Sequence, residues 1–411
     1  MQDKHMEPLD TSALPAPRSM AAVNTSDTKL TLPFFDRNSG LNVALVAFSL
    51  ILAVVWSPLG LLLWPGFLLL EDVLYFGFGR SLLDTEVAVQ RGYQFAHVFL
   101  DRVSGHGRDL GFNLYDGELT KTGPRAQADK WAFMFAQLGL KPGDRLIDIG
   151  CGYGDWLDYA RSRGVDVVGV NISLEQADYA KTHRGLEIVA RNWKDISGDA
   201  RLREQLFGQF DAVTFMDTIE HYVPSTHRKS LEKQGEIYRQ MFELAAHLLR
   251  PQARPGRVFI SCLHQNDKTW GLQANVSAYF LTRYHSGFYP MGPDGLSRWS
   301  RDWFNEKARW DKTEDYRLTG VLDRDHFQAP KIRWTLRKLG MIPLLLLCDP
   351  HHLHKWIEIK ADTWMRLFGE RRWDEHYDPQ FRQKVSYVIL WWLLLERAAP
   401  VGAAAEKRSG N

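Results

Sequence analysis

Two groups of residues in this sequence have the types and spacing to do chemistry. The first is the stretch Arg145–Gly154, R-L-I-D-I-G-C-G-Y-G, in which an apolar run ends on Asp148 and three glycines follow at every second position. Glycine tolerates backbone angles closed to other residues and lets a ligand approach the main chain, while a helix that begins there offers unpaired N–H groups. The stretch predicts a strand that turns tightly into a helix and cradles a nucleotide-like ligand.

The second group consists of carboxylate and imidazole side chains. The stretch T-F-M-D-T-I-E-H-Y places Asp217, Glu220 and His221 directly after an apolar run, and I-S-C-L-H places His264 after another. If both runs are parallel strands, their carboxyl ends meet at one edge of the sheet, where ligands of open α/β sheets bind. A carboxylate and an imidazole at that edge can form one proton-accepting cluster, so we expect Glu220 and His264 to be catalytic.

The elements that would position these groups alternate along the chain. Strands alternating with helices indicate βαβ units, and therefore an α/β fold with a mostly parallel, Rossmann-like sheet and helices on both faces. We expect strands at Arg145–Ile149, Val165–Val170, Leu186–Ala190, Phe210–Phe215 and Arg257–Cys262, and helices at Ala126–Leu138, Trp156–Arg163, Leu174–His183 and Ser225–Leu249.

The spacing of the glycines distinguishes this turn from the dinucleotide fingerprint, which reads G-x-G-x-x-G. The sequence D-I-G-C-G-Y-G resembles motif I of the class I S-adenosylmethionine (SAM) methyltransferases, D-x-G-x-G-x-G. The resemblance implies SAM as the cofactor. The residues that would bind it in this turn are Asp148, Gly150, Cys151, Gly152 and Gly154.

Further cofactor contacts are expected at the ends of the next two strands. Many class I methyltransferases carry an acidic residue for the ribose after the second strand, whereas this chain offers the neutral hydrogen-bonding groups of Asn171, Ser173 and Gln176. After the third strand, Asn192 offers a polar contact and Trp193 a stacking face for the adenine.

A longer set of segments resembles one methyltransferase family. K-P-G-D-R-L-I-D-I-G-C-G-Y-G, D-V-V-G-V-N-I-S-L-E-Q-A, I-E-H-Y and C-L-H are similar to segments of the cyclopropane-fatty-acid synthases, which include the mycolic-acid methyltransferases. The resemblance implies transfer of the SAM methyl group to a carbon of an unsaturated acyl chain in a membrane lipid. Such a reaction leaves a carbocation, which requires aromatic faces and a base. In the family the base is bicarbonate, whose holders here would be Glu220, His264 and Tyr387.

One departure from the family leaves the product open. The family's Y-S-C segment, whose cysteine helps to hold bicarbonate, reads N-L-Y-D-G-E-L-T at Asn113–Thr120, without a cysteine. Residues from Leu114 to Glu118 could replace it, or Glu118 could supply the base itself. A methylated chain is therefore as compatible with the sequence as a cyclopropane, and so is a sphingolipid, a sterol or isoprenoid, or another hydrophobic metabolite as the substrate. The missing cysteine and the neutral Asn171 are also compatible with a non-catalytic SAM-binding partner of a membrane enzyme.

An apolar segment precedes the predicted core. No residue from Asn38 to Leu70 is charged, and a helix needs about 20 apolar residues to span a bilayer. Because Pro58 and Pro65 interrupt the segment, it predicts one tilted transmembrane span or a shallow re-entrant hairpin, with a buried hairpin of a soluble domain as the alternative. SAM is supplied by the cytoplasm, so we expect a membrane protein whose catalytic domain faces the cytoplasm.

The whole chain of 411 residues divides into six expected segments. These are a disordered leader (1–33), a membrane-associated or transmembrane segment (34–75), a helical cover (76–125), the SAM-binding core (126–264), an aromatic-rich helical lid insertion (265–340), and a last strand, Met341–Cys348, with an apolar helix, Val385–Leu395, in 341–411.

Composition excludes several other classes of protein. A net charge of +2 lacks the basic field of a nucleic-acid binder, so we expect no nucleic-acid partner. The three cysteines lie far apart with no C-x-x-C pair, so the sequence suggests neither a disulfide framework nor a zinc site. We also expect no metal at His351, His352 and His354, because no carboxylate or cysteine pattern completes a site. The sequence does not indicate an oligomeric state.

Overall fold

The computed structural model describes residues 37–74, single residues and short runs between 78 and 109, residues 111–265 apart from 228–229 and 252–254, and residues 289–290, 294–322 and 388–398. The predicted leader, the predicted strand Met341–Cys348, the three histidines near residue 352 and Tyr387 all lie outside the described residues.

The core of the protein is a seven-stranded sheet with the order β3-β2-β1-β4-β5-β7-β6. Five neighbouring strands are parallel, and β7 runs antiparallel to both of its neighbours. The predicted α/β class with a mostly parallel sheet is confirmed. The strands are β1 (Arg145–Ile149), β2 (Asp166–Val170), β3 (Glu187–Val189), β4 (Ala212–Met216), β5 (Arg257–Gln265), β6 (Phe304–Asp311) and β7 (Val388–Arg397).

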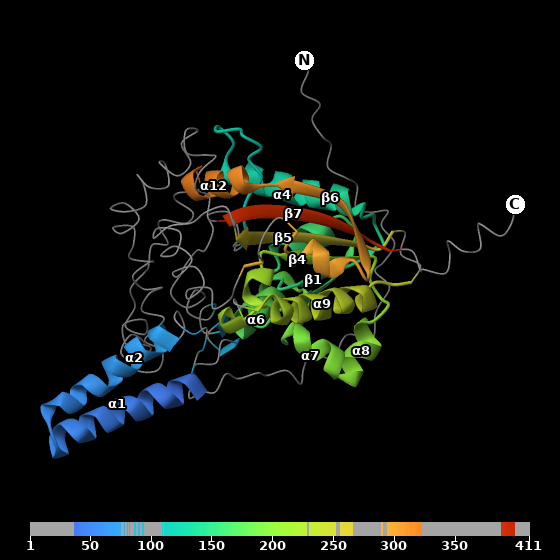
Figure 1. Cartoon of the computed structure of the whole chain (residues 1–411). Coiled ribbons are helices and arrows are strands. Elements are labelled where there is room, and N and C mark those ends of the chain that lie inside the picture. The colour runs from blue at the N-terminus through green and yellow to red at the C-terminus, as the bar shows by residue number, and fades with distance from the viewer. Residues whose placement is uncertain are drawn as a thin grey trace, which may run out of the picture.

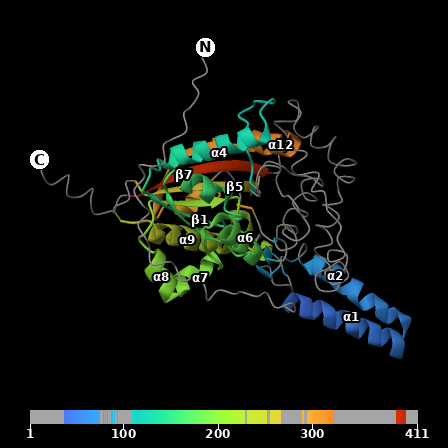
Figure 2. The ribbon, with the colours of Figure 1, turned by 180° about the vertical axis from the view of Figure 1, so that it is seen from behind.

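Helices cover the two faces of this sheet. In Figure 1, and in the view from behind in Figure 2, α4 lies above the sheet and α9 below it. Neighbouring strand residues such as Leu146 and Ile147 enter different apolar clusters, because successive side chains of a strand point to opposite faces. The helices of the core are α4 (Gly123–Leu138), α5 (Asp155–Arg161), α6 (Leu174–Arg184), α7 (Trp193–Gly198), α8 (Ala200–Leu206), α9 (Leu231–Leu248), α11 (Ser297–Ser300) and α12 (Thr313–Leu322).

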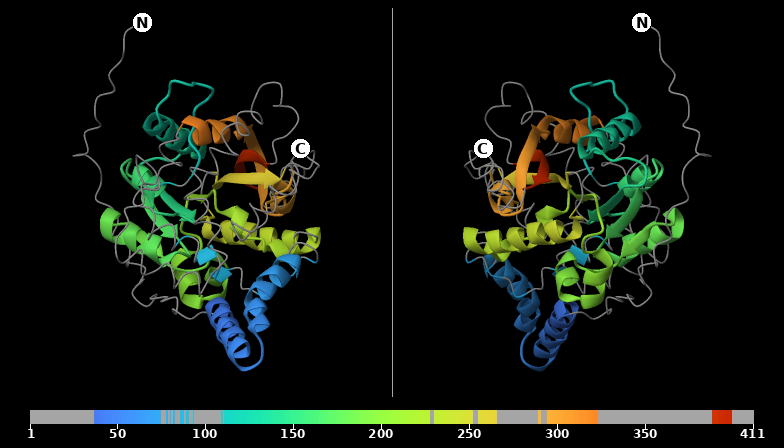
Figure 3. Two further views of the ribbon diagram at one scale, coloured as in Figure 1. Left: turned by 90° about the vertical axis from the view of Figure 1, so that its left-hand side faces the viewer. Right: turned by 90° about the vertical axis from the view of Figure 1, so that its right-hand side faces the viewer.

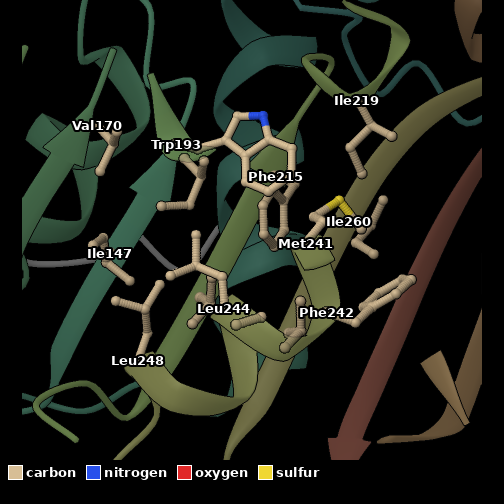
Figure 4. Close-up of a cluster of buried hydrophobic side chains, with 14 of the residues drawn as sticks. Ile147, Val170, Trp193, Phe215, Ile219, Met241, Phe242, Leu244, Leu248 and Ile260 are labelled. Atoms are coloured by element: carbon tan, nitrogen blue, oxygen red, sulfur yellow. The ribbon is translucent and has the colours of Figure 1, made fainter. Parts of the chain in front are cut away.

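The long helix α9 closes one of these clusters. Figure 4 shows Met241, Leu244 and Leu248 of α9 directed at Ile147 and Phe215 of the sheet. The sequence predicted this helix from its apolar stripe, although it begins at Leu231 rather than at Ser225, where the structure has a short 3-10 turn. The sequence analysis did not predict α7 and α8.

The predicted apolar helix Val385–Leu395 is wrong, because this part of the chain forms strand β7 between β5 and β6. The adjacent residues Trp392 and Leu393 of β7 belong to apolar clusters on opposite faces of the sheet, so the strand is buried on both faces. A strand of this kind has a continuous apolar run without alternation, which periodicity cannot tell from a buried helix.

The expected lid insertion at 265–340 is also not wholly helical. Residues Phe304–Asp311 form the edge strand β6, while α11 and α12 flank it. The sequence did not predict β6 because the strand contains several charged residues. Edge strands commonly carry charged side chains, which prevent further strand pairing.

The apolar N-terminal segment folds as a helical hairpin that projects from the core (Figures 1 and 3). It comprises α1 (Arg37–Val55), a 3-10 helix at Pro58–Leu62 and α2 (Leu63–Val73). Within the described part of the chain, no helix has both the length and the apolar character required to cross a membrane. The predicted transmembrane span is therefore not supported, and the observed form is a hairpin.

Candidate active site

The turn after β1 has the strained geometry that its glycines allow. Gly150 and Gly154 adopt positive φ angles of 87° and 79°. A Cβ added to Gly150 would lie 2.3 Å from the Thr218 hydroxyl oxygen, and one added to Gly154 would lie 2.4 Å from a Leu186 methyl carbon. Around a Cβ on Gly152, in contrast, there is nothing within 4 Å. The outer glycines serve close packing, whereas the main chain at Gly152 borders open space that a ligand can fill.

Asp148 at the end of β1 is buried and joins two strands. Its Oδ1 accepts a hydrogen bond from the Thr214 hydroxyl at 2.7 Å, and the Thr214 oxygen accepts one from Trp156 Nε1 at 3.2 Å. Burial raises the pKa of Asp148 to about 7, against the lowering effect of the Thr214 hydrogen bond. The carboxyl group therefore fixes the start of the glycine turn relative to β4.

The polar residues after β2 support the same turn. Asn171 Nδ2 donates to the Gly152 carbonyl at 2.9 Å and to Gln176 Oε1 at 3.1 Å, and Asn171 Oδ1 accepts from Ser173 N–H at 3.0 Å. Both amide hydrogens of Asn171 are thus occupied, one by the glycine turn and the other by Gln176 of α6. Gln176 Nε2 is buried without a hydrogen-bond partner in the described residues, so it is a donor available to a ligand hydroxyl.

The two residues after β3 that were expected to contact adenine also have structural roles. Asn192 caps α7, its side chain accepting a hydrogen bond from Lys194 N–H at 3.1 Å. Trp193 is buried, with its ring 4.7 Å from that of Tyr222. The two residues lie at the carboxyl edge of β3, and their expected contact with adenine stays a prediction.

Glu220 lies in the 3-10 turn Ile219–His221 that follows β4, and His264 lies near the carboxyl end of β5; their catalytic role stays a prediction. Glu220 Oε1 accepts a hydrogen bond at 2.7 Å from the N–H of Leu263, the residue next to His264. Glu220 Oε2 is buried and, among the residues that the structure describes, has no hydrogen-bond partner. Burial, followed by the charge of Asp217, raises the pKa of Glu220 above its usual range.

His264 is a buried, neutral imidazole. Because a carbonyl oxygen only accepts, the 3.0 Å contact between His264 Nδ1 and the Cys262 carbonyl places the ring proton on Nδ1. Burial lowers the pKa of His264 to about 4. The ring therefore keeps Nε2 as its acceptor over the physiological pH range.

Asp217 lies beside Glu220 with a strained backbone, at a φ of 51°. Its Oδ1 accepts a short hydrogen bond from the Ser261 hydroxyl, and burial raises the pKa of its carboxyl group. A Cβ added to Gly111 would lie 2.5 Å from Asp217 Oδ2, which places the segment before α4 directly against this carboxylate.

Three site residues were not identified from the sequence. Tyr93 donates to or accepts from His221 Nε2 at 2.7 Å, and burial, with Glu220 and Asp217 nearby, raises the pKa of its hydroxyl. The buried Lys130 and the half-buried Asp109 form an ion pair beside Gly111. Burial alone would raise the pKa of Asp109, but Lys130 holds it below its usual value. Tyr93 lies in the segment predicted as a helical cover, and no local pattern in the sequence marks Tyr93 or the ion pair.

The segment expected to replace the missing cysteine contacts the start of α12. The N–H groups of Tyr115 and Asp116 donate to Asp315 at the start of α12, at 2.6 and 2.7 Å. Glu118 is exposed and lies 4.0 Å from Lys121. A direct catalytic role for Glu118 is therefore not supported by its position. No cluster of three or more potential metal-binding side chains occurs in the described residues.

Known proteins are similar to this chain in the part that contains the predicted site. Residues 109–293 match the family model described as mycolic acid cyclopropane synthetase. The family resemblance is confirmed. The cyclopropane-synthase-like segment contains the glycine turn, Glu220 and His264, which are the residues on which the resemblance was based.

Curated relatives match shorter parts of the chain. A protein of Mycobacterium tuberculosis named probable fatty acid methyltransferase is 36% identical over 104 residues, 24% of this chain and 22% of the relative. A ubiquinone biosynthesis O-methyltransferase of Dechloromonas aromatica is 30% identical over 164 residues, 39% of this chain and 63% of the relative. This chain thus covers less than two thirds of either protein. Both names agree with the predicted class of enzyme, a SAM-dependent methyltransferase.

Solved structures agree on the fold. A cyclopropane synthase of Mycobacterium tuberculosis has a TM-score of 0.53 at 18% identity, covering 77% of this chain and 100% of that one. A mycolic acid cyclopropane synthase in complex with SAH and CTAB has a TM-score of 0.51 at 18% identity, covering 77% of this chain and 99% of that one. The sheet and its helices are therefore those of a class I methyltransferase, as the sequence predicted.

Proposed function

We propose that this protein is a SAM-dependent C-methyltransferase that acts on unsaturated acyl chains of membrane lipids at the cytoplasmic face of a membrane. The observation that carries the proposal is the set of residues at the carboxyl edge of the sheet around the neighbouring strands β1 and β4, where the strand order reverses. The glycine turn follows β1, Glu220 follows β4 and accepts a hydrogen bond from Leu263 of β5, and His264 lies near the end of β5. Ligands of open α/β sheets bind at such a switch point.

The residues of the turn fit the proposed cofactor. Open space borders the main chain at Gly152, and Gln176 Nε2 is a buried donor without a partner in the described residues. Bound SAM would supply an electrophilic methyl group on a positively charged sulfur. The buried carboxylates Asp148, Asp217 and Glu220 favour positive charge in this region when they are ionised.

Glu220 is the residue best placed to take a proton from the alkylated chain. When the π electrons of a C=C bond form the new C–C bond, the neighbouring carbon becomes a cation and a C–H proton must leave. Glu220 Oε2 has no hydrogen-bond partner in the described residues, and its raised pKa makes it a stronger base than an exposed carboxylate. Proton loss from the new methyl group closes a cyclopropane, and loss from an adjacent carbon leaves a methylated alkene. The comparisons do not support bicarbonate, and this step does not require it.

A second candidate is O-methylation of a hydrophobic phenol. It is favoured by the similarity to ubiquinone biosynthesis O-methyltransferases, which extends over more of this chain than the fatty-acid relative does. The same carboxylate could remove a phenolic proton. The two candidates differ in the atom that receives the methyl group.

The test incubates the purified full chain with methyl-labelled SAM and vesicles of unsaturated phospholipid, saturated phospholipid, or phospholipid containing a quinol. We expect label in the organic phase with the unsaturated lipid, bound to carbon by mass-spectrometric fragmentation. Label that requires the quinol would establish the second candidate, and label confined to protein or water-soluble products would exclude both.

A matched pair of variants tests whether the chain is catalytic or only a SAM-binding partner. Glu220→Gln should retain SAM binding and lose turnover by about 100-fold or more, the usual size of a general-base contribution. Glu118→Gln, an exposed carboxylate outside the cluster, should leave both unchanged. A wild-type chain that binds SAM without turnover on any lipid would support the non-catalytic alternative.

A further inference from the structure

The N-terminal hairpin has the reverse polarity of a hairpin in a water-soluble domain. Its most outward side chains are apolar: Val54, Trp56 and Leu59 are 87%, 86% and 71% exposed. Its polar side chains face inward, with Asn42 and Ser49 only 1% and 4% exposed. In water such an arrangement forfeits the free energy of burying apolar surface, so another apolar medium must surround the hairpin.

The hairpin also satisfies its polar groups internally. Asn42 Oδ1 accepts a hydrogen bond from Trp64 Nε1 at 3.4 Å, and the Ser49 hydroxyl donates to the Gly60 carbonyl. At the turn, the N–H groups of Trp56 and Ser57 donate to the Leu52 carbonyl at 2.9 and 3.0 Å. Internal satisfaction of this kind is what a segment needs in lipid, where no water is present to pair with it.

The distribution of exposed apolar side chains indicates that lipid, rather than another protein, surrounds the hairpin. They lie along both helices and at the turn, and none of the residues from 38 to 70 is charged. A protein groove or a second copy of the chain would cover one side of a helix and leave the other in water. A lipid leaflet surrounds every side. The outward apolar residues are Phe48, Leu50, Ile51, Val54, Val55, Trp56, Leu59, Leu61, Leu62, Leu69, Leu70 and Val73.

The 3-10 helix at the turn packs closely against the end of α1. A Cβ added to Gly60 would lie 2.5 Å from the Ala53 backbone nitrogen and 2.7 Å from the Leu52 carbonyl carbon. Small residues allow such close backbone contact in lipid, where the hydrophobic force between helices is absent.

We propose that this hairpin inserts, turn first, into one leaflet of a phospholipid membrane and returns to the same side without crossing. The inference rests on the proposed function only for the identity of the substrate. Residues that follow the hairpin reach the carboxyl edge of the sheet, since Glu86 contacts Lys194 at 3.3 Å and Tyr93 contacts His221 at 2.7 Å. Insertion therefore anchors the catalytic edge close to the lipid surface.

The experiment is flotation of the full chain with phosphatidylcholine vesicles on a density gradient. The wild type should float, and Leu59→Glu should reduce the partition coefficient at least tenfold, because it places a charge in the apolar phase. Leu119→Glu is the matched control, since Leu119 is 63% exposed but lies outside the hairpin. SAM binding by all three chains checks that they are folded.

Equal flotation of the wild type and Leu59→Glu would overturn the proposal. If Leu59→Glu also dissociates a dimer in lipid-free solution, the occupant is a second copy of the chain. Turnover on detergent-dispersed unsaturated lipid separates this proposal from the previous one. Vesicle binding that depends on Leu59 without any turnover sinks the proposed reaction alone, whereas turnover on vesicles that is unaffected by Leu59→Glu sinks the hairpin proposal alone.

Discussion

At the residue scale, burial shifts the two proton-handling side chains of the site in opposite directions. The pKa of Glu220 rises and that of His264 falls, and each shift favours the uncharged form. His264 is consequently uncharged wherever the enzyme works, while Glu220 changes from acid to base at a pH above the ordinary range for glutamate. The pH dependence of turnover should therefore report Glu220 rather than His264.

We predict that turnover at saturating SAM and lipid rises with pH through the raised pKa of Glu220, because only the ionised carboxylate accepts a proton. The measurement is a pH profile of kcat, with SAM binding measured at each pH as the control. A profile governed by a group with a pKa near 4, flat above pH 5, would contradict the assignment of Glu220 as the base.

Asp148 gives a second pH prediction, this time for stability. Its pKa is about 7 in the folded chain against 3.8 for the ordinary carboxyl group, so the folded state holds the proton more tightly. The stability associated with this proton is fully present below about pH 4 and is lost as the pH rises toward 7. Because one pKa unit corresponds to about 1.36 kcal/mol, the loss is at most about 4 kcal/mol.

Asp148→Asn should remove this part of the pH dependence while keeping an acceptor for Thr214. The measurement is the free energy of unfolding in denaturant at pH 5 and pH 8 for the wild type and the variant. Asp178→Asn, at an exposed carboxyl on α6, serves as the control. An equal fall in stability for wild type and Asp148→Asn would show that other groups cause it.

At the scale of elements, the glycine turn separates packing from ligand binding. Gly154 faces Leu186, whereas Gly152 faces open space, although both have positive φ angles. The same substitution to alanine should thus act differently at the two positions.

Gly152→Ala should cost about 1 kcal/mol of stability for its left-handed backbone and weaken SAM binding tenfold or more, because the methyl group enters the space left for the ligand. Gly154→Ala should cost more stability, about 2 kcal/mol, because a clash with Leu186 is added to the same backbone strain. Calorimetric SAM titration and denaturant unfolding of both variants measure these effects. Similar losses of affinity at similar stability would contradict the assignment.

Strand β7 is the element on which the second half of the sheet depends. Trp392 is fully buried, and its Nε1 donates at 3.1 Å to Ser261, whose hydroxyl in turn donates to Asp217. Trp392→Ala should lower the free energy of unfolding by about 3 to 5 kcal/mol, as expected for a large buried aromatic residue. Trp391→Ala on the same strand, at a less buried position, is the comparison and should cost less. Equal losses in denaturant unfolding would show that the strand is not held by the Trp392 contacts.

At the scale of the whole molecule, the sequence predicted features that depend on neighbouring residues and did not predict contacts between residues far apart in the chain. The five parallel strands and the glycine turn have local signatures, and β1 was predicted with its observed bounds. Glu220 and His264 were predicted as site residues because each lies near the end of an apolar run that forms such a strand. Tyr93 reaches His221 across 128 positions, and Lys130 has the sequence surroundings of an exposed helix residue although it is buried. Contacts of this kind become visible only when the fold is known.

The position of β7 has a consequence for how the protein is made. Of the seven strands that the structure describes, β7 comes last in the sequence, yet it lies between β5 and β6 and is the strand to which β6 pairs. While the ribosome is still synthesising residues before 388, the edges of β5 and β6 remain unpaired and open to association with other chains. The hairpin, in contrast, leaves the ribosome early and depends on local contacts. On our proposal that the hairpin inserts into a leaflet, a nascent chain can be attached to a membrane before its active site exists.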